Sequence, residues 1–333
     1  MRPDVALDVR ETSHTSVGML AYVRALRRLL PQIAPDLRLA AFGGGDNFDL
    51  SEQVGIPLAL ARLRPRLAHL PTPYVPRFLP VPYLVTVHDL IDLEFPQHAK
   101  RKVGPYWRHV VGPVLRAARA VITDDDATVA LLERYLHVDP ARVRVVPLGI
   151  DVPVPLPEPR PARRPYFFYA GNHRPHKDLA TLVEAWAALP AGDPVDLILT
   201  GPEEPELRAV EPARGELIFA GEVDAAELWR LHRGAAAYVH PALREGFGLP
   251  LLEALQAGTP VIAAETATPA VLEPHVHRFP PHDALALRAL LLRVLEQPQD
   301  FARVAERGRA ATAHLTWERT VRATADLYRE LLA

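Results

Sequence analysis

The chain has 333 residues, with 38 Lys and Arg side chains against 40 Asp and Glu. Its hydrophobic fraction of 49% and charged fraction of 23% are typical of a globular protein, and its length fits two domains. A formal net charge of −2 argues against a dedicated nucleic-acid-binding protein, so we expect no nucleic-acid partner. The chain contains no cysteine, which excludes disulfides, thiolate nucleophiles and Cys-ligated zinc.

The sequence gives no sign of membrane insertion or export. No apolar run approaches the roughly 20 residues that a membrane-spanning helix needs. Asp4 and Asp8 interrupt the region where a signal peptide would require an apolar core. We therefore expect a cytoplasmic protein.

Residues 1–150 alternate short apolar, β-branched runs with amphipathic helical patterns. Such alternation is typical of a parallel sheet covered by helices on both faces. We therefore expect an N-terminal Rossmann-like domain over this half of the chain. Its predicted helices include 18–30 and 127–137, and its predicted strands are 5–9, 37–42, 83–88, 120–123 and 144–146.

A proline-rich segment, residues 151–165, follows this domain. Proline stands at every second position from 153 to 161 and again at 165. Each proline fixes φ and removes a backbone donor, so the segment can be neither a helix nor a central strand. We interpret it as a semi-rigid linker between two domains. A long surface loop inside one domain is the alternative.

The same alternation returns after the linker and predicts a second Rossmann-like domain over residues 166–315, followed by a C-terminal helix in 316–333. In open α/β sheets a ligand binds beyond the carboxyl ends of the strands, so we expect the site in a cleft between the two domains. The predicted helices include 179–189, 225–234 and 250–257, and the predicted strands are 166–170, 195–200, 217–220, 236–240 and 261–263.

The most informative segment joins one of these strands to the next helix. Glu245 and Glu253 stand eight positions apart, around a turn that contains Gly246 and Gly248. Glycines let the backbone approach a ligand closely, and the free amides at a helix start attract anions. Two carboxylates beside such a turn suit a ligand with both hydroxyls and phosphates. Acidic residues that merely favour the helix dipole would explain Glu253 but not Glu245.

A second turn of this kind follows the strand 166–170. It contains Arg174 and Lys177, and Asp178 is the predicted N-cap of the next helix. Lysine is a compact point charge, and this arginine-rich chain has only three, at positions 100, 102 and 177. A lysine at this turn favours a contact with phosphate.

These motifs resemble those of the retaining glycosyltransferases of family 4, which have the GT-B fold. The resemblance covers essentially the whole chain and includes the E-x7-E motif. It implies two Rossmann-like domains whose parallel sheets face a central cleft, and allows the C-terminal helix to return to the N-terminal domain. The matching segments are Asp8-Val-Arg, Gly18, His88-Asp89-Leu, Pro147-Leu-Gly-Ile-Asp151, Gly171…Lys177-Asp178, Glu245-Gly-Phe-Gly-Leu-Pro-Leu-Leu-Glu253, Ala257-Gly-Thr-Pro-Val and Trp317-Glu.

The resemblance implies a role for each matching residue of the second domain. Glu245, with the backbone of Gly246, Phe247 and Gly248, would hold the donor sugar, and Gly248 would also contact the donor phosphate. Glu253 would accept hydrogen bonds from the donor ribose.

It also implies how the charged leaving group is held. Lys177 and Arg174 would neutralise the donor diphosphate, and Gly18 would lie against it. The family often has arginine where this chain has His176, so Arg174 must serve if two cations are needed. His88 would lie near the reacting sugar carbon, so that Glu245, His88 and Lys177 are the predicted catalytic residues.

The implied reaction moves a hexosyl group, with retention, from a nucleotide-diphosphate sugar such as GDP-mannose or a UDP-hexose. The acceptor would be a glycan, a lipid-linked or a small-molecule acceptor held by the first domain. Fixed cations and helix amides can stabilise the departing diphosphate, so we expect neither a metal nor a cofactor. The alternatives are a phosphorylase or epimerase on the same fold, and a non-catalytic subunit that only binds the sugar nucleotide.

Two other features have competing interpretations. The acidic run 124–126 could be a metal-binding D-x-D motif of the other, metal-dependent glycosyltransferase fold, but a helix N-cap cluster fits the two-domain pattern better. His88 could be a structural histidine, but its position next to Asp89 at the edge of the predicted cleft favours a site residue.

Residues 95–123 carry six basic side chains and no acidic one, with Tyr106 and Trp107 among them. Solvated helix faces are the ordinary outcome for such a stretch. The second interpretation is a peripheral contact with anionic lipid at the inner face of the membrane, with the two aromatic side chains at the interface.

Overall fold

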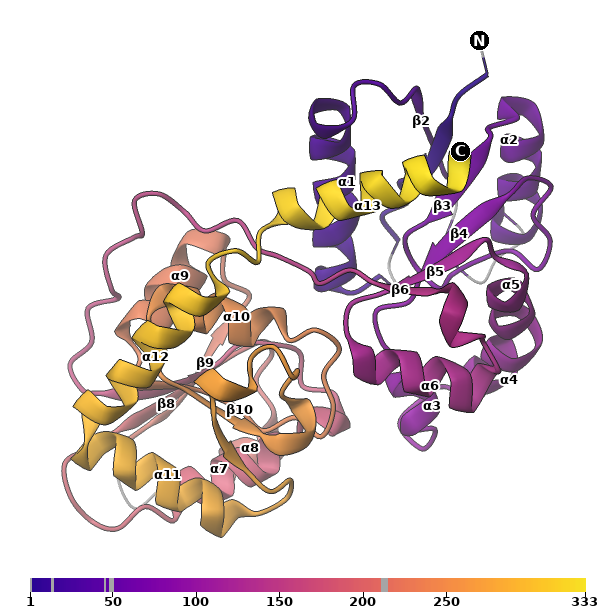
Figure 1. The fold of residues 1–333 in the computed structure, drawn as a ribbon. Coiled ribbons are helices and arrows are strands. Elements are labelled where there is room, and N and C mark those ends of the chain that lie inside the picture. Colours follow the sequence, from indigo (N-terminus) through magenta and orange to yellow (C-terminus); the bar gives the residue numbers. More distant parts are fainter. Residues whose placement is uncertain (1, 13–14, 45, 48–50, 211–214) are drawn as a thin grey trace. The chain divides into compact units, whose positions relative to one another are not determined.

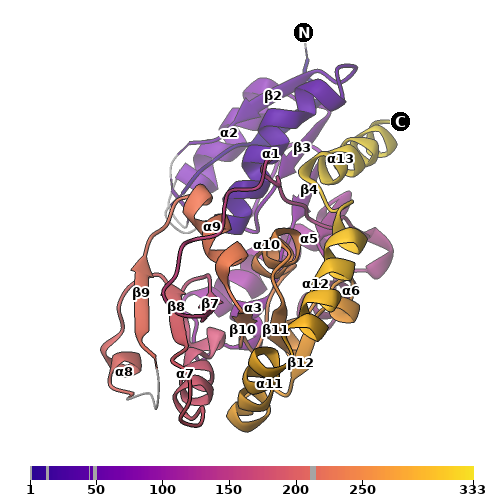
Figure 2. The same ribbon diagram turned by 90° about the vertical axis from the view of Figure 1, so that its left-hand side faces the viewer.

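The computed structural model describes residues 2–12, 15–44, 46–47, 51–210 and 215–333. The chain divides into two compact units (Figures 1 and 2). Unit 1 comprises Met1–Gly149 and Leu315–Ala333, and unit 2 comprises Ile150–His314. The proline-rich residues 151–165 contain no helix or strand. Within the described part of the chain, no helix combines the length and apolarity that a membrane crossing requires.

Unit 1 is built on a parallel six-stranded sheet with the order β2-β1-β3-β4-β5-β6. Sequence analysis predicts five of these strands and misses β3, because Pro65 and Pro71 flank it and His69 interrupts its apolar run. The strands are β1 (Val5–Asp8), β2 (Leu39–Phe42), β3 (Leu67–Leu70), β4 (Tyr83–Thr86), β5 (Ala120–Thr123) and β6 (Val143–Val145).

The first helix of unit 1 begins after Ser16, whose hydroxyl accepts a hydrogen bond of 3.3 Å from the amide of Met19. It continues to Ile33, past Pro31, and is therefore longer than predicted. The helices of unit 1 are α1 (Val17–Ile33), α2 (Ile56–Leu63), α3 (Ile91–Glu94), α4 (Val103–Tyr106), α5 (Gly112–Ala117), α6 (Asp126–Leu136) and α13 (Trp317–Leu332).

The C-terminal helix α13 packs against α1, about 300 residues away in the sequence (Figure 1). Trp317, Val321, Leu327 and Tyr328 of this helix are buried, and Leu331 is half-buried. A buried chain of hydrogen bonds adds to this contact, because His69 bonds the Tyr328 hydroxyl at 2.6 Å and the Thr86 hydroxyl at 2.8 Å. Burial lowers the pKa of His69 to about 3, so the ring is neutral.

Unit 2 is built on a second parallel six-stranded sheet, with the order β12-β11-β10-β7-β8-β9. Sequence analysis misses β12, which has three residues, two of them polar, and lies at the edge of the sheet. The strands are β7 (Tyr166–Tyr169), β8 (Asp196–Thr200), β9 (Leu217–Gly221), β10 (Ala237–His240), β11 (Val261–Ala264) and β12 (His277–Phe279).

The helices of unit 2 form two groups around this sheet. Helix α7 packs against α11, and α10 packs against α9 and α12 (Figure 2). Trp186 of α7 is fully buried, and its indole N–H donates to the carbonyl of Val195 at 2.9 Å. The helices are α7 (Leu179–Ala187), α8 (Pro205–Arg208), α9 (Ala225–Gly234), α10 (Leu249–Ala257), α11 (Ala284–Glu296) and α12 (Pro298–Thr312). The prediction of two α/β domains with parallel sheets is confirmed.

The buried hydrogen bond between α13 and β3 gives a test of what holds the C-terminal helix. We expect Tyr328→Phe to lower the free energy of unfolding by about 1–3 kcal/mol, because a buried ring nitrogen of His69 loses its partner. The control Arg329→Ala, which removes an exposed ion pair with Asp36, should cost less than about 1 kcal/mol. Urea denaturation measures both. Equal losses would show that surface ion pairs hold the helix.

Candidate active site

The order of the strands in unit 2 determines which loops can meet. The chain passes from β7 to β8 and β9 on one side, then returns to β10 on the other side of β7. The loops after β7 and β10 therefore begin side by side, at the carboxyl edge of the sheet. Ligands of open α/β sheets bind at such a reversal of strand order.

The structure brings together Lys177 and Glu245, which follow these two strands. Lys177 Nζ donates to Glu245 Oε2 at 2.5 Å, and the side chains are only 9% and 17% exposed. The amide of Leu243 donates to the carbonyl of His176 at 2.8 Å and fastens one loop to the other. His176 is itself buried. The lysine of one turn and the first glutamate of the other, which the sequence singles out separately, are thus in direct contact.

His240, the last residue of β10, is a third member of this cluster. Its Nε2 lies 2.8 Å from Glu245 Oε2, and its Nδ1 lies 3.0 Å from the hydroxyl of Tyr238. Burial lowers the pKa of His240, which keeps the ring neutral. The neutral ring donates from Nε2 to the carboxylate and accepts at Nδ1. Sequence analysis gave His240 no role, although its place at a strand end, five residues before Glu245, was a usable signal.

The electrostatics of the cluster keep Glu245 ionised. Burial alone would raise the pKa of this carboxyl. The nearby Lys177 ammonium and the hydrogen bond from His240 outweigh burial and hold the pKa well below its ordinary value. The cluster therefore consists of one carboxylate, Glu245, that is bonded by a cation, Lys177, and by a neutral donor, His240.

The glycine turn leads from this cluster into α10. Gly248 is the N-cap residue and has a left-handed φ of +77°, which a side chain rarely adopts. A Cβ there would also lie 3.1 Å from Leu251. Gly246, Phe247 and Gly248 are all buried in the ligand-free structure.

Glu253 lies one helical turn further along α10. The predicted helix 250–257 would place Glu253 in its first turn. The helix begins at Leu249, so Glu253 belongs to the second turn instead. Its side chain is partly buried, and burial raises the pKa of Glu253 to about 7.

Arg174 and Asp178, which belong with Lys177 to the turn after β7, differ in their surroundings. Arg174 is exposed and forms no ion pair with the residues that the structure describes. Asp178 occupies the predicted N-cap position of α7, but its side chain does not cap the helix. It accepts instead from the Thr181 hydroxyl at 2.8 Å and pairs with His282 at 3.0 Å.

Unit 1 contains a second buried pair at the ends of neighbouring strands. His88 follows β4 and Asp124 follows β5, and His88 Nδ1 lies 2.7 Å from Asp124 Oδ2. The N-cap interpretation of the acidic run is confirmed for Asp125, which accepts from the Thr128 amide at 2.7 Å. It is wrong for Asp124, whose contact with His88 the sequence did not reveal.

The His88 ring is buried, with 6% of its surface exposed. Burial would lower the pKa of His88, but the Asp124 carboxylate, with a smaller contribution from Asp89, raises it above the ordinary value. The second ring nitrogen, Nε2, has no hydrogen-bond partner of normal geometry among the residues that the structure describes. Gly18 lies in the same unit, as the second residue of α1.

The basic stretch 95–123 does not present its aromatic residues as expected. Trp107 is only 6% exposed and belongs to the core of unit 1. The Tyr106 hydroxyl donates to Glu52 at 2.9 Å, inside the fold. The burial of these rings argues against the part of the second interpretation that places them at a lipid interface. Lys100 and Arg108 are exposed.

The pKa of Glu253 predicts how stability changes with pH. The folded protein holds this proton up to about pH 7, whereas the unfolded chain releases it near 4.5, so the free energy of unfolding falls as pH rises between these values. We expect Glu253→Gln to remove this decrease in the free energy of unfolding. The free energy of unfolding of the variant should equal that of the wild type near pH 4.5 and exceed it by about 1–3 kcal/mol near pH 8.

Urea denaturation of the ligand-free protein at both pH values measures this difference. Glu265→Gln, which changes an exposed carboxylate of the same unit, is the control and should follow the wild type. If Glu253→Gln also follows the wild type at both pH values, Glu253 is already ionised in the folded protein.

Two family profiles match the chain, and solved structures match its fold. The profile described as "Glycosyltransferase Family 4" matches residues 39–154, and "Glycosyl transferases group 1" matches residues 157–311. Sucrose-phosphate synthase from Thermosynechococcus elongatus superposes with a TM-score of 0.77 at 24% identity over 99% of both chains. HepE from Anabaena, in complex with UDP and glucose, gives 0.73 at 16% identity over 98% of this chain and 100% of HepE.

Curated relatives are similar over most of the chain. O-antigen chain mannosyltransferase B of Escherichia coli is 26% identical over 292 residues, which are 82% of this chain and 76% of the relative. D-inositol 3-phosphate glycosyltransferase of Saccharomonospora viridis is 29% identical over 282 residues, which are 76% of this chain and 65% of the relative. The chain thus spans between about two thirds and three quarters of these relatives. It belongs to the family 4 type of glycosyltransferases and has the GT-B fold.

Proposed function

We propose that the protein is a retaining, metal-independent hexosyltransferase that uses a nucleotide-diphosphate sugar as donor. The observation that carries this proposal is the Lys177–Glu245 pair at the ends of β7 and β10. A cation lies there beside a carboxylate, a group that can accept hydrogen bonds from hydroxyls, next to the glycine turn that starts α10. HepE, whose structure holds UDP and glucose, supports a nucleotide-sugar donor.

In the proposed complex, different residues of unit 2 bind different parts of the donor. Lys177 binds the diphosphate as a point charge, and the exposed Arg174 adds a second cation. The start of α10, which no side chain caps, contributes the positive end of the helix dipole. Glu245 accepts hydrogen bonds from the sugar hydroxyls, and Glu253, one turn further on, accepts them from the ribose.

In the proposed reaction the bond between the sugar C1 and the diphosphate oxygen breaks, and a bond from C1 to an acceptor hydroxyl oxygen forms on the same face. The acceptor proton passes to the departing diphosphate. Negative charge grows on the diphosphate as the bond breaks, and preorganised Lys177 and the helix amides stabilise it without rearrangement. His88 of unit 1 is proposed to lie near the reacting carbon. These groups supply the charge that a metal would otherwise provide.

Binding of the donor gives the first test. A panel of GDP-, UDP- and ADP-sugars should contain a donor that raises the melting temperature of the wild type, because a ligand that binds only the folded state stabilises it. GDP-mannose and the UDP-hexoses are the expected donors, since O-antigen chain mannosyltransferase B is similar to this chain. For Lys177→Ala, the donor concentration that gives half of the maximal rise in melting temperature should increase at least about tenfold, since a charge-assisted hydrogen bond to the donor is lost.

The matched control is Lys100→Ala, which removes an exposed lysine of unit 1 and should leave the shift unchanged. Lys177→Ala itself leaves Glu245 unpaired, so each variant is compared with its own ligand-free melting temperature. An unchanged shift in Lys177→Ala would contradict the proposed diphosphate contact. A donor that binds but is never consumed, in the wild type and in Glu245→Gln alike, would favour the non-catalytic alternative.

Contact with a membrane is a separate proposal, supported only by exposed basic side chains of the stretch 95–123, such as Lys100 and Arg108. Since Tyr106 and Trp107 are directed into the fold, binding to anionic vesicles would be electrostatic and should disappear with added salt. Co-sedimentation with phosphatidylserine-containing vesicles at low salt measures it, and absence of binding there would end the proposal.

A further inference from the structure

A row of buried polar groups leads along β10 to the carboxylate of Glu245. Tyr238 and His240 are two residues apart on this strand, so their side chains lie on the same face of the sheet. The Tyr238 hydroxyl lies 3.2 Å from the carbonyl oxygen of Ala170 and 3.0 Å from His240 Nδ1. His240 Nε2 lies 2.8 Å from Glu245 Oε2, which also accepts from Lys177. The row therefore ends at the ion pair of the candidate site.

The hydrogen atoms of this row can be placed from the partners of each group. The ionised Glu245 only accepts hydrogen bonds, so His240 Nε2 carries a hydrogen. In the neutral ring Nδ1 then has a lone pair and accepts from the Tyr238 hydroxyl. In a protonated ring Nδ1 would donate to the Tyr238 oxygen, and the hydroxyl hydrogen would turn to the Ala170 carbonyl. Tyr238 thus offers His240 a partner in either protonation state.

The charges around His240 oppose each other. Burial lowers the pKa of His240, the Glu245 carboxylate raises it, and the Lys177 ammonium lowers it again. The other titratable side chains that face the ring or its partner Tyr238 are Tyr169, His232 and Glu253. His232 adds no positive charge, because burial lowers its pKa to about 3. Withdrawal of the Lys177 ammonium would therefore raise the proton affinity of His240.

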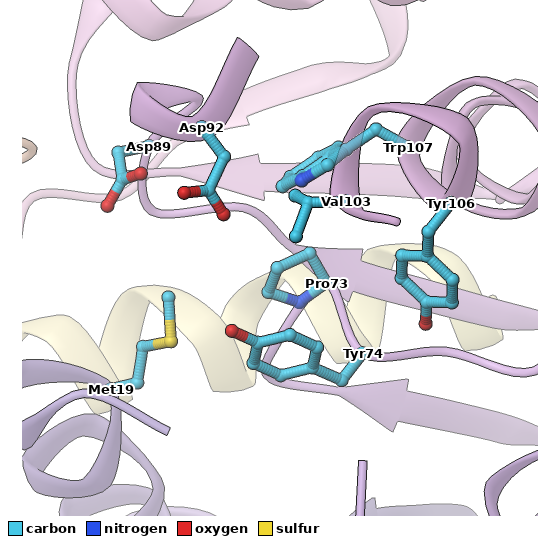
Figure 3. Close-up of a pocket in the computed structure, with 8 residues that line it drawn as sticks. All are labelled: Met19, Pro73, Tyr74, Asp89, Asp92, Val103, Tyr106 and Trp107. Carbon is cyan, nitrogen blue, oxygen red and sulfur yellow. The ribbon is translucent and has the colours of Figure 1, made fainter. Parts of the chain in front are cut away.

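His88 of unit 1 shows that burial does not by itself keep a histidine of this protein neutral. Burial would lower the pKa of His88, but Asp124, 2.7 Å from Nδ1, and more weakly Asp89 raise it above the ordinary value. Asp89 lines a small hollow of unit 1 together with Asp92 (Figure 3). Carboxylates beside a buried histidine are thus able to outweigh burial.

We propose that His240, assisted by Tyr238, replaces Lys177 as the cation that pairs with Glu245 when the ammonium turns to a diphosphate. The inference rests on the proposed function, which supplies the diphosphate. The proton comes from solvent and binds to His240 Nδ1, while Nε2 keeps its hydrogen bond to Glu245. The buried carboxylate then never lacks a compensating charge. His240 and Tyr238 are positioning residues, which hold Glu245 for the sugar while Lys177 holds the phosphate.

Nitrogen NMR of isotope-labelled histidine side chains tests the inference, because the two ring nitrogens report the tautomer and the protonation state separately. The signals of His240 are assigned by their loss in His240→Gln. In the ligand-free wild type at about pH 7 we expect a neutral ring with its hydrogen on Nε2. Lys177→Met removes the ammonium without a donor. In this variant the pH at which half of His240 is protonated should rise by at least about one pH unit.

Lys100→Met, which replaces an exposed lysine of unit 1, is the matched control and should leave this midpoint unchanged. Combining Lys177→Met with Tyr238→Phe should give a smaller rise, because the protonated Nδ1 then lacks an acceptor. In Tyr238→Phe alone the ion pair is kept, and the Nδ1 signal should move as its hydrogen bond is lost. That variant decides the matter if Lys177→Met does not fold, and melting temperatures confirm that each variant is folded.

The same spectra are then recorded on the wild type with GDP-mannose or UDP-glucose, whichever raises the melting temperature. Bound donor should raise the His240 midpoint as Lys177→Met does. Four results would overturn the inference: a ligand-free wild-type ring that is protonated or carries its hydrogen on Nδ1, an unchanged midpoint in Lys177→Met, an unchanged midpoint with bound donor, or an unchanged Nδ1 signal in Tyr238→Phe. If neither donor raises the melting temperature, the proposed function fails, and the ligand-free spectra still decide this inference.

Discussion

The candidate site of unit 2 depends on one carboxylate oxygen, Glu245 Oε2, which receives hydrogen bonds from both Lys177 and His240. The three residues come from loops and a strand that meet only because β10 lies next to β7. Because Lys177 neutralises Glu245 without a ligand, the ligand-free site holds no uncompensated buried charge. An arriving diphosphate would compete for the same ammonium. Donor binding would then exchange one ion pair for another.

In unit 1 a buried histidine, His88, also pairs with a carboxylate, but its pKa is shifted in the opposite direction. Burial lowers the pKa of His240, and the adjacent Lys177 opposes a second positive charge there. Near His88 the neighbouring groups are the carboxylates Asp124 and Asp89, which raise its pKa. The pKa values of these two buried histidines are thus shifted in opposite directions: burial prevails at His240, where Lys177 adds to it, and the carboxylates prevail at His88. His240 serves as a neutral donor, whereas His88 is able to hold a proton.

The sequence predicts what local patterns determine. Apolar alternation located ten of the twelve strands that the structure describes, and the two turns that the sequence singles out contact each other through Lys177 and Glu245. It missed β3 and β12, which are short and interrupted by polar residues that only tertiary contacts explain, such as His69 bonded to Tyr328. It also missed His240 and Asp124 as partners. Their importance comes from strand order, which brings together residues that are separated along the chain and which no local pattern encodes.

The two units distribute charge in complementary ways. In unit 2 the exposed Arg174 and the buried Lys177 precede a helix start, which is why we propose that this unit binds the diphosphate. In unit 1 the corresponding strand ends carry the carboxylates of Asp124 and Asp89 beside His88, and these raise the pKa of its ring. If both substrates are sugars, their hydroxyls alone do not direct either substrate to one unit, since carboxylates in both units can accept hydrogen bonds from hydroxyls. Under the proposed function, the diphosphate would therefore decide which unit holds the donor, because Lys177 and Arg174 belong to unit 2.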